Sequence, residues 1–255
     1  MKISVITCTW NSEPFLAESI ESVLCQDHPD IEYIFVDGGS TDGTLERIAA
    51  IPRPTIVIHG VRGGISRAMN EGIKAATGEI VAHLHSDDYY LGPRVLSTVA
   101  AAMEDKTYGW CFGRIKRIVG GQLIAESYVA PRYSPNQLQR GNFIPHPATF
   151  VRRSLMNQAG MFRETLKYAM DYDLWLRLST MSAAKELNVA MAAFRVHEGS
   201  LSSSNRFAAM DEDQAVRLAH CGGNPFARLE HMLRYRVRRY RAGKASESLK
   251  LGGGS

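Results

Sequence analysis

The sequence has 255 residues, of which 45% are hydrophobic and 22% are charged, and its formal net charge is +4. These values are typical of a soluble globular protein with one enlarged domain or a domain plus an appendage. The charge is too mild to indicate a nucleic-acid partner, and no apolar run approaches the roughly 18 residues of a membrane span. The chain starts in a predicted strand rather than a signal peptide, so we expect a cytoplasmic protein.

The cysteines indicate neither a metal centre nor a disulfide framework. The sequence places them far apart, at Cys8, Cys25, Cys111 and Cys221, and no two form a C-x-x-C pair. Structural zinc sites and small disulfide-stapled folds both need closer or paired spacings. We therefore expect reduced thiols.

Strand-like and helix-like patterns alternate in the first part of the chain. Apolar runs that contain β-branched residues predict strands at 2–7, 31–36, 55–59 and 80–84. Apolar residues at helical spacing predict helices between them, at 15–24, 45–50 and 67–76. This alternation predicts an α/β fold, with a Rossmann-like, mostly parallel sheet and helices on both faces.

The pattern changes after residue 92. Pro93 precedes a predicted helix at 95–103, and runs at 110–118 and 122–128 around Gly120-Gly121 predict a small antiparallel hairpin. The segment 131–147 is rich in Pro, Asn and Gln, which predicts a long loop that acts as a lid or binds substrate. The remaining predicted elements are a strand at 149–151, helices at 153–159 and 171–180, and a strand at 187–196.

Polar residues gather where three predicted strands end, at 7–11, 37–44 and 86–88. The carboxyl ends of parallel strands meet at one edge of a sheet, so these clusters should converge on a ligand, which in this geometry is most often a nucleotide. The chain lacks both G-x-G-x-x-G and G-x-x-x-x-G-K-[ST]. Ordinary dinucleotide binding and P-loop hydrolysis therefore lose support.

Two adjacent carboxylates, Asp87 and Asp88, follow the strand predicted to begin at Ile80. Neighbouring carboxylates repel each other, and a divalent cation relieves the repulsion, often with phosphates completing its ligand shell. The alternative is that Ser86, Asp87 and Asp88 cap a following helix. The residues alone leave both interpretations open.

Five short motifs occur in one order across about the first 200 residues. They are V-D-G-G-S-T-D-G-T at 36–44, A-M-N-E-G-I at 68–73, G-E-I at 78–80, S-D-D at 86–88 and D-Y-D-L-W-L-R at 171–177. With these motifs the chain resembles the family 2 glycosyltransferases of the GT-A fold. The resemblance implies a GT-A-like sheet, a nucleotide-sugar donor that is UDP-linked by family habit, Mn²⁺ or Mg²⁺, and inversion at the anomeric carbon.

The resemblance also implies a donor site. Asp37 matches the acidic residue that reads the nucleobase, while Thr7, Thr9 and Trp10 match the loop that frames base and ribose. In the S-D-D motif, Asp87 would contact the ribose.

The metal would bind at the end of the same motif. Asp88 matches its metal ligand, and Ser86 stands where the family more often has Asp, a variation that the family tolerates. His197 matches a C-terminal histidine that can complete the metal or diphosphate shell.

Inverting transfer needs a carboxylate that is free of the metal and takes the proton from the acceptor hydroxyl. Asp171 matches the family's catalytic base, although the family usually has Glu-Asp where this chain has Met170-Asp171. Asp171 and Asp173 lie on different faces of the predicted helix, so only one can face the acceptor. We expect Asp171 to be the base; the alternative is a plain acid at a helix N-terminus.

Other polar residues allow two interpretations. Arg67 and Asn70 lie near a predicted helix start whose N–H groups can face phosphate, but Arg67 can equally be a surface charge. His146, between two prolines, suits either an acceptor or phosphate contact or a structural role. His83 and His85 share one face of a strand and are interpreted mainly as packing or supporting groups.

The C-terminal part is basic and helical in pattern. Arginines at 234, 236, 238, 239 and 241 accompany a single acid, Glu230, and apolar residues recur near helical spacing. We expect a glycosyltransferase domain at 1–204, with a nucleotide-binding half (1–92) and an acceptor-binding half (93–204). A helical basic extension at 205–244 would follow, and then a flexible tail at 245–255 that ends in a linker-like G-G-G-S.

A basic amphipathic helix can lie on an anionic membrane surface. Peripheral contact with the inner face of the cytoplasmic membrane would suit a lipid-linked sugar acceptor. The alternative is a helix that packs on the catalytic domain and exposes a solvated basic face.

The function predicted from the sequence is transfer of a sugar to a hydroxyl of a glycan or lipid-linked acceptor in surface polysaccharide synthesis. A nucleotidyltransferase is a second candidate, but it would need a Gly-rich, basic first loop, and 7–12 is neither. A non-catalytic nucleotide-sugar or glycan-binding module is a third, and the retention of Asp88 and Asp171 argues against it. The sugar, linkage and oligomeric state stay open.

Overall fold

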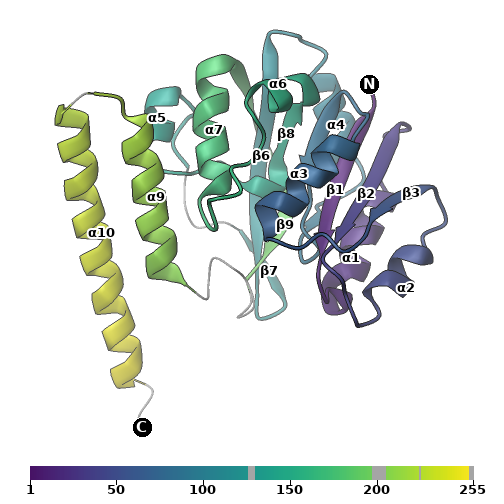
Figure 1. Cartoon of the computed structure of the whole chain (residues 1–255), viewed down its shortest axis with the longest axis horizontal. Coiled ribbons are helices and arrows are strands. Elements are labelled where there is room, and N and C mark those ends of the chain that lie inside the picture. Colours follow the sequence, from purple (N-terminus) through teal and green to yellow (C-terminus); the bar gives the residue numbers. More distant parts are fainter. Residues whose placement is uncertain (126–129, 197–204, 224, 253–255) are drawn as a thin grey trace.

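The structure is a computed structural model that describes residues 1–125, 130–196, 205–223 and 225–252 (Figure 1). A nine-stranded sheet lies at its centre. The first part of the chain builds four parallel strands, β1 (Ile3–Thr9), β2 (Ile31–Asp37), β3 (Thr55–Ile58) and β4 (Ile80–His83), in the order β3-β2-β1-β4. The connecting helices are α1 (Glu13–Leu24), α2 (Thr44–Ala49) and α3 (Ile65–Ala75).

The second half of the sheet is mainly antiparallel. Its strands are β5 (Tyr89–Tyr90), β6 (Tyr108–Val119), β7 (Gln122–Ala125), β8 (Thr149–Arg152) and β9 (Ala183–Arg195). The order continues from β4 as β8-β6-β9-β5, and of these described strands only β6 and β9 run parallel to each other. The predicted hairpin is found as β6 and β7, and its predicted end at 126–128 lies outside the described residues.

Helices cover both faces of the sheet, as predicted. Successive residues of β1 point to opposite faces, so Val5 packs in one apolar cluster with α1 and α4 (Val95–Ala102), and Ile6 packs in another with α3 and α7 (Met170–Met181). Burial on both faces explains why the parallel strands are nearly continuous apolar runs. The predicted α/β fold class is confirmed.

The prediction of a long irregular loop at 131–147 is wrong. This segment contains the helix α5 (Pro135–Arg140), and a one-turn 3₁₀ helix, His146–Ala148, follows it. Ser134 caps α5 by accepting a hydrogen bond from the Gln137 N–H at 3.2 Å, and proline occupies the first turn. Ser-Pro at a helix start is a known start signal, but the helix is too short to show apolar periodicity.

The C-terminal part forms two helices, α9 (Arg206–His220) and α10 (Pro225–Gly252). α9 packs against α5 and α7, and α10 packs on α9 at the outer edge of the molecule (Figure 1). α10 continues through 245–252, where the sequence led us to expect a flexible tail. None of the described helices is both long and apolar enough to cross a bilayer.

α9 is closely joined to the rest of the fold. Arg217 is only 2% exposed, and its guanidinium lies 5.7 Å from the Tyr172 ring centre and 3.4 Å from the Tyr172 hydroxyl. The predicted boundary at residue 204 therefore falls between two parts of the chain that pack tightly together. α6 (Arg153–Gln158) completes the helical layer beside α7.

Candidate active site

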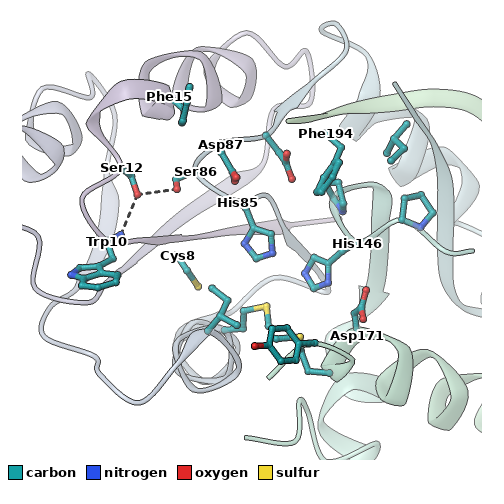
Figure 2. A pocket seen from close by; sticks show the side chains of 18 of the residues that line it. Cys8, Trp10, Ser12, Phe15, His85, Ser86, Asp87, His146, Asp171 and Phe194 are labelled. Carbon is teal, nitrogen blue, oxygen red and sulfur yellow. Dashed lines mark hydrogen bonds between the residues drawn. The ribbon is translucent and has the colours of Figure 1, made fainter. Parts of the chain in front are cut away.

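A cavity of about 680 Å³ opens at the carboxyl ends of β1 and β4 (Figure 2). Segments distant in the sequence form its walls: the end of β1, the loop after β4, the segment 144–147, the start of α7, the end of β9 and one residue of α9. The lining includes Trp10, His85, Ser86, Asp87, Asp88, His146, Asp171 and Phe194. Asp88 and Asp171, far apart in the sequence, thus share one cavity.

Asp88 is almost fully buried at the edge of this cavity, with 1% of its surface exposed. Its Oδ1 accepts a hydrogen bond from the Arg195 N–H at 3.0 Å, while its Oδ2 has no hydrogen-bond partner among the described residues. Burial, and next the charge of Asp87, raises the pKa of Asp88 well above its usual range. A buried carboxylate oxygen without a partner suits a cation that arrives with the ligand.

The helix-cap interpretation of the S-D-D motif is wrong. The residues after Asp88 form the short strand β5, which pairs with β9, and α4 begins only at Val95. The Ser86 hydroxyl lies 2.9 Å from that of Ser12, which joins the loop after β4 to the start of α1 (Figure 2). The motif therefore presents its side chains to the cavity instead of a helix end.

A metal held at Asp88 would need ligands beyond the protein side chains described here. Among the described residues, no group of three or more His, Cys, Asp or Glu side chains is arranged to hold an ion. Asp87 and Asp88 supply carboxylates on one side of the cavity, and a diphosphate could complete the shell from the other. The predicted ligand His197 lies outside the described residues.

Asp171 lies on another wall of the cavity, in the first turn of α7 (Figure 2). Its Oδ1 accepts a hydrogen bond from the Tyr172 N–H at 2.6 Å, and its Oδ2 accepts one from the Asn142 amide at 3.3 Å. Burial raises the pKa of Asp171 to about 6. At neutral pH it is thus ionised but close to its pKa, as a general base should be.

Asp173 has a different environment. It is fully buried and absent from the cavity lining, and three basic side chains surround it: Arg163 at 2.9 Å, Arg177 at 2.8 Å and the His220 ring at 2.9 Å. Burial alone would raise the pKa of Asp173, but the His220 hydrogen bond and Arg177 outweigh it and lower the pKa. Of the two acids left open by the sequence, only Asp171 faces the cavity.

Of the four residues predicted to read or frame the base and ribose, one lines the cavity and three do not. Trp10 is 73% exposed and lines the cavity. Thr7, Thr9 and Asp37 are buried and do not line it. The Thr7 hydroxyl instead donates to the Leu84 carbonyl at 2.8 Å.

Asp37 is engaged within its own loop. Its carboxylate accepts hydrogen bonds from the Thr9 hydroxyl at 2.9 Å, the Gly39 N–H at 2.8 Å, and the N–H and hydroxyl of Ser40 at 2.9 and 2.5 Å. Burial would raise the pKa of Asp37, but these hydrogen bonds lower it. In this conformation Asp37 shapes the loop after β2, and contact with a base would require some of these bonds to be exchanged.

The two predicted residues of α3 also lie outside the lining. Arg67 is exposed on the helix, whereas Ile65 and Met69 of the same helix reach the cavity. Asn70 is buried: its amide donates to the Phe162 carbonyl at 2.9 Å and accepts from the Phe162 N–H at 3.0 Å. Asn70 thus fixes α3 to the segment that leads toward α7.

Three neutral histidines form a cluster that the sequence only partly indicated. The rings of His85 and His146 are stacked with centres 4.9 Å apart, and His83 lies 5.6 Å from His146. Burial holds the pKa of His83 at about 3 and lowers those of His85 and His146. His85 and His146 line the cavity, whereas His83, the other histidine of the His-x-His pattern, does not.

The contribution of α9 was missed. Glu212 accepts hydrogen bonds from the N–H groups of Lys167, Tyr168 and Ala169, directly before α7. A second cavity of about 270 Å³ lies between α7 and α9, and Asp171 lines both cavities. The sequence of 205–220 contains no motif from which these contacts could be predicted.

Residues 4–159, more than half of the chain, match the protein family described as "Glycosyl transferase family 2". The chain is 32% identical over 192 residues to a chondroitin synthase of Pasteurella multocida, which covers 73% of this chain and 20% of that protein. The chain therefore spans about a fifth of the length of this curated relative. It is 25% identical over 240 residues, 92% of each chain, to UDP-Glc:alpha-D-GlcNAc-diphosphoundecaprenol beta-1,3-glucosyltransferase WfgD of Escherichia coli.

Two solved structures resemble the fold. TarS 1-349 of S. aureus in complex with UDP-GlcNAc gives a TM-score of 0.71 at 23% identity, over 91% of this chain and 69% of that one. The mannosyltransferase PcManGT of Pyrobaculum calidifontis, in complex with GDP-Man and Mn²⁺, gives 0.66 at 20% identity, over 99% and 79% of the two chains. Both likenesses concern the fold.

Proposed function

This chain belongs to glycosyl transferase family 2, and we propose that it transfers a sugar from a UDP-linked donor to a hydroxyl of a glycan or lipid-linked acceptor. One observation carries the proposal: Asp88 and Asp171, on separate elements, line the same cavity of about 680 Å³. An inverting transfer requires one acid that binds a cation and a separate acid that accepts the proton of the acceptor hydroxyl.

Asp171 acts as the base in this proposal. Its carboxylate takes the proton of the acceptor hydroxyl while that oxygen attacks the anomeric carbon, and the bond to the diphosphate breaks. The attack comes from the face opposite the leaving group, so the configuration inverts. The pKa of about 6 supports this role, because Asp171 is ionised at neutral pH and can still hold a proton during transfer.

In this proposal Asp88 would hold the metal, and Asp87 and the diphosphate of the donor would supply further ligands. Bound Mn²⁺ or Mg²⁺ would offset the charge that develops on the leaving diphosphate. Among the described residues the Oδ2 of Asp88 has no hydrogen-bond partner, which supports the assignment, as does the Mn²⁺ bound with GDP-Man in the mannosyltransferase PcManGT. His197 is proposed as an additional ligand from outside the described residues.

The donor is proposed to lie along the end of β1 and the loop after β4. Trp10 offers an exposed ring for the base, and Ser86 and Asp87 offer groups to the ribose. Thr7, Thr9 and Asp37 would hold the loop that binds the base in place. Arg67 remains proposed for the phosphate side, and Asn70 would act there by fixing α3 through its hydrogen bonds to Phe162. The UDP-sugars of TarS and WfgD favour a uridine donor.

The acceptor is proposed to approach from the α9 side, where the second cavity meets Asp171. The WfgD relative acts on a sugar carried by diphosphoundecaprenol, and such an acceptor would place this enzyme in the cytoplasm at the inner membrane face. Synthesis of a surface polysaccharide is the proposed biological context.

A donor panel tests the proposal. The purified chain would be incubated with UDP-, GDP- and dTDP-sugars and Mn²⁺, and both thermal stabilisation and release of the nucleoside diphosphate would be measured. We expect one UDP-sugar to stabilise the protein and to be slowly hydrolysed. Stabilisation with no hydrolysis would favour a binding module, and release of pyrophosphate from a nucleoside triphosphate and a sugar phosphate would favour a nucleotidyltransferase.

A further inference from the structure

The outer face of α10 is apolar although it has no protein layer over it in the described part of the chain. α10 contacts α9 through its inner face, where His231 and Ala242 are each 4% exposed. Figure 1 shows α10 at the edge of the molecule, with α9 between it and the sheet. The opposite face of α10 therefore points away from the protein.

Large apolar side chains follow one another along this outer face. They are three or four positions apart, which aligns them on one side of a helix. We call them the α10 stripe: Phe226 (82% exposed), Leu229 (55%), Leu233 (53%), Val237 (50%) and Tyr240 (64%). At the rise of an α-helix the stripe is about 20 Å long. Its side chains thus form one continuous apolar strip, unlike the single exposed apolar residues that are common on protein surfaces.

Arginines border the α10 stripe on both sides. By helical position, Arg236 and Arg239 lie on one side, and Arg234 and Arg241 lie on the other. Glu230 is the one acid of α10 between Pro225 and Lys244, and it is paired with Arg234 at 2.8 Å. Within this part of α10, no acid therefore compensates the charges of Arg236 and Arg241. Arg239 forms an ion pair with Asp211 of α9, so the positive charge beside the stripe comes mainly from Arg236 and Arg241.

We propose that the α10 stripe and its arginines dock on an anionic lipid bilayer, with the helix lying in the membrane surface. The apolar side chains would enter the interface, and the arginines would meet anionic headgroups. A second copy of the chain is a poorer occupant, because a helix pair formed by this face would bring Arg236 and Arg241 of both copies together while Glu230 is already paired with Arg234. The inference stands on α10 alone and does not depend on the proposed reaction.

Vesicle binding by the full chain tests this inference. Cosedimentation would be measured with vesicles of phosphatidylcholine alone and of phosphatidylcholine with phosphatidylglycerol, at low and at high salt. We expect binding to the anionic vesicles, weakened by salt because exposed charges are screened, and little binding to phosphatidylcholine. Equal binding to both kinds of vesicle, or none to either, would overturn the proposal.

Substitutions separate the contribution of the apolar stripe to vesicle binding from the contribution of the arginines. Leu233→Asp should weaken binding to anionic vesicles at least tenfold, and Arg236→Gln with Arg241→Gln should weaken it about fivefold for each arginine. Val189→Asp is the matched control, because Val189 is 45% exposed on β9, away from α10, and this variant should bind like the wild type. Circular dichroism and thermal melting would show that each variant is folded.

Two outcomes would contradict the proposed occupant. If Leu233→Asp and Val189→Asp bound vesicles equally well, the stripe would have no part in docking. If the wild type formed a concentration-dependent dimer in analytical ultracentrifugation that Leu233→Asp dissociated, a second copy of the chain would be the occupant instead of lipid.

Discussion

Glu212 on α9 and Ala169, the residue before α7, are joined by a hydrogen bond of 3.0 Å from the Ala169 N–H to the Glu212 carboxylate. The same carboxylate accepts from Lys167 at 2.8 Å and from Tyr168. Ala169 is the N-cap of α7 and has no side chain that could accept a hydrogen bond there. A carboxylate from another helix therefore satisfies backbone groups at the start of the helix that carries Asp171, and its charge suits the positive end of the helix dipole.

Glu212→Gln should loosen the start of α7. The amide keeps one acceptor oxygen but loses the charge and places N–H groups against N–H groups, so we expect a loss of about 1–2 kcal/mol in the free energy of unfolding. Amide hydrogen exchange at 167–169 should accelerate, and turnover should fall because Asp171 is held less firmly. Glu230→Gln, which breaks only a surface pair on α10, should change stability by less than about 0.5 kcal/mol. Unchanged exchange at 167–169 in Glu212→Gln would show that the contact does not hold the helix start.

Asp171→Asn should separate donor binding from transfer. Removing the proton acceptor while keeping the shape of the side chain should lower the transfer rate about 10²- to 10⁴-fold, with donor affinity little changed. Steady-state kinetics and donor titration on the same preparation would measure both. Asp173→Asn is the comparison: it removes the buried partner of Arg163, Arg177 and His220, so its main effect should be a loss of about 3 kcal/mol in stability. Wild-type turnover in Asp171→Asn would refute the assignment of the base.

The sequence predicted the elements that its apolar pattern determines and missed those that depend on distant contacts. Runs such as 31–36 read as strands because both sides of the sheet bury them. Asp171 was expected to face the ligand from its motif, whereas the role of Asn70 depends on Phe162, which lies far away in the chain. Glu212 reads as an ordinary acid of a polar helix until α9 is placed beside α7. The two-residue strand β5 is likewise too short to have a pattern.

The pH dependence of transfer should report Asp171. Since its pKa is about 6 in the folded protein, the rate should be constant above about pH 7 and fall about tenfold per pH unit well below 6 as the carboxylate becomes protonated. The raised pKa also means that the folded chain binds this proton more tightly than the unfolded chain. Its contribution to stability is therefore complete below the ordinary pKa of 3.8 and is lost as the pH rises through about 6. A rate that stayed constant down to pH 5 would contradict a pKa of about 6 for Asp171.

Metal dependence should disappear with Asp88. In the wild type, EDTA should abolish transfer and Mn²⁺ or Mg²⁺ should restore it. Because a ligand that binds only the folded state stabilises it, Mn²⁺ with UDP at about a hundred times its dissociation constant should add about 2.7 kcal/mol to the free energy of unfolding. Asp88→Asn should lose this stabilisation. The metal-free variant should be at least as stable as the wild type, because it no longer buries a carboxylate whose Oδ2 has no hydrogen-bond partner among the described residues. Thermal melts with UDP alone and with UDP plus Mn²⁺ would measure the difference; equal Mn²⁺ stabilisation of both proteins would remove Asp88 from the metal site.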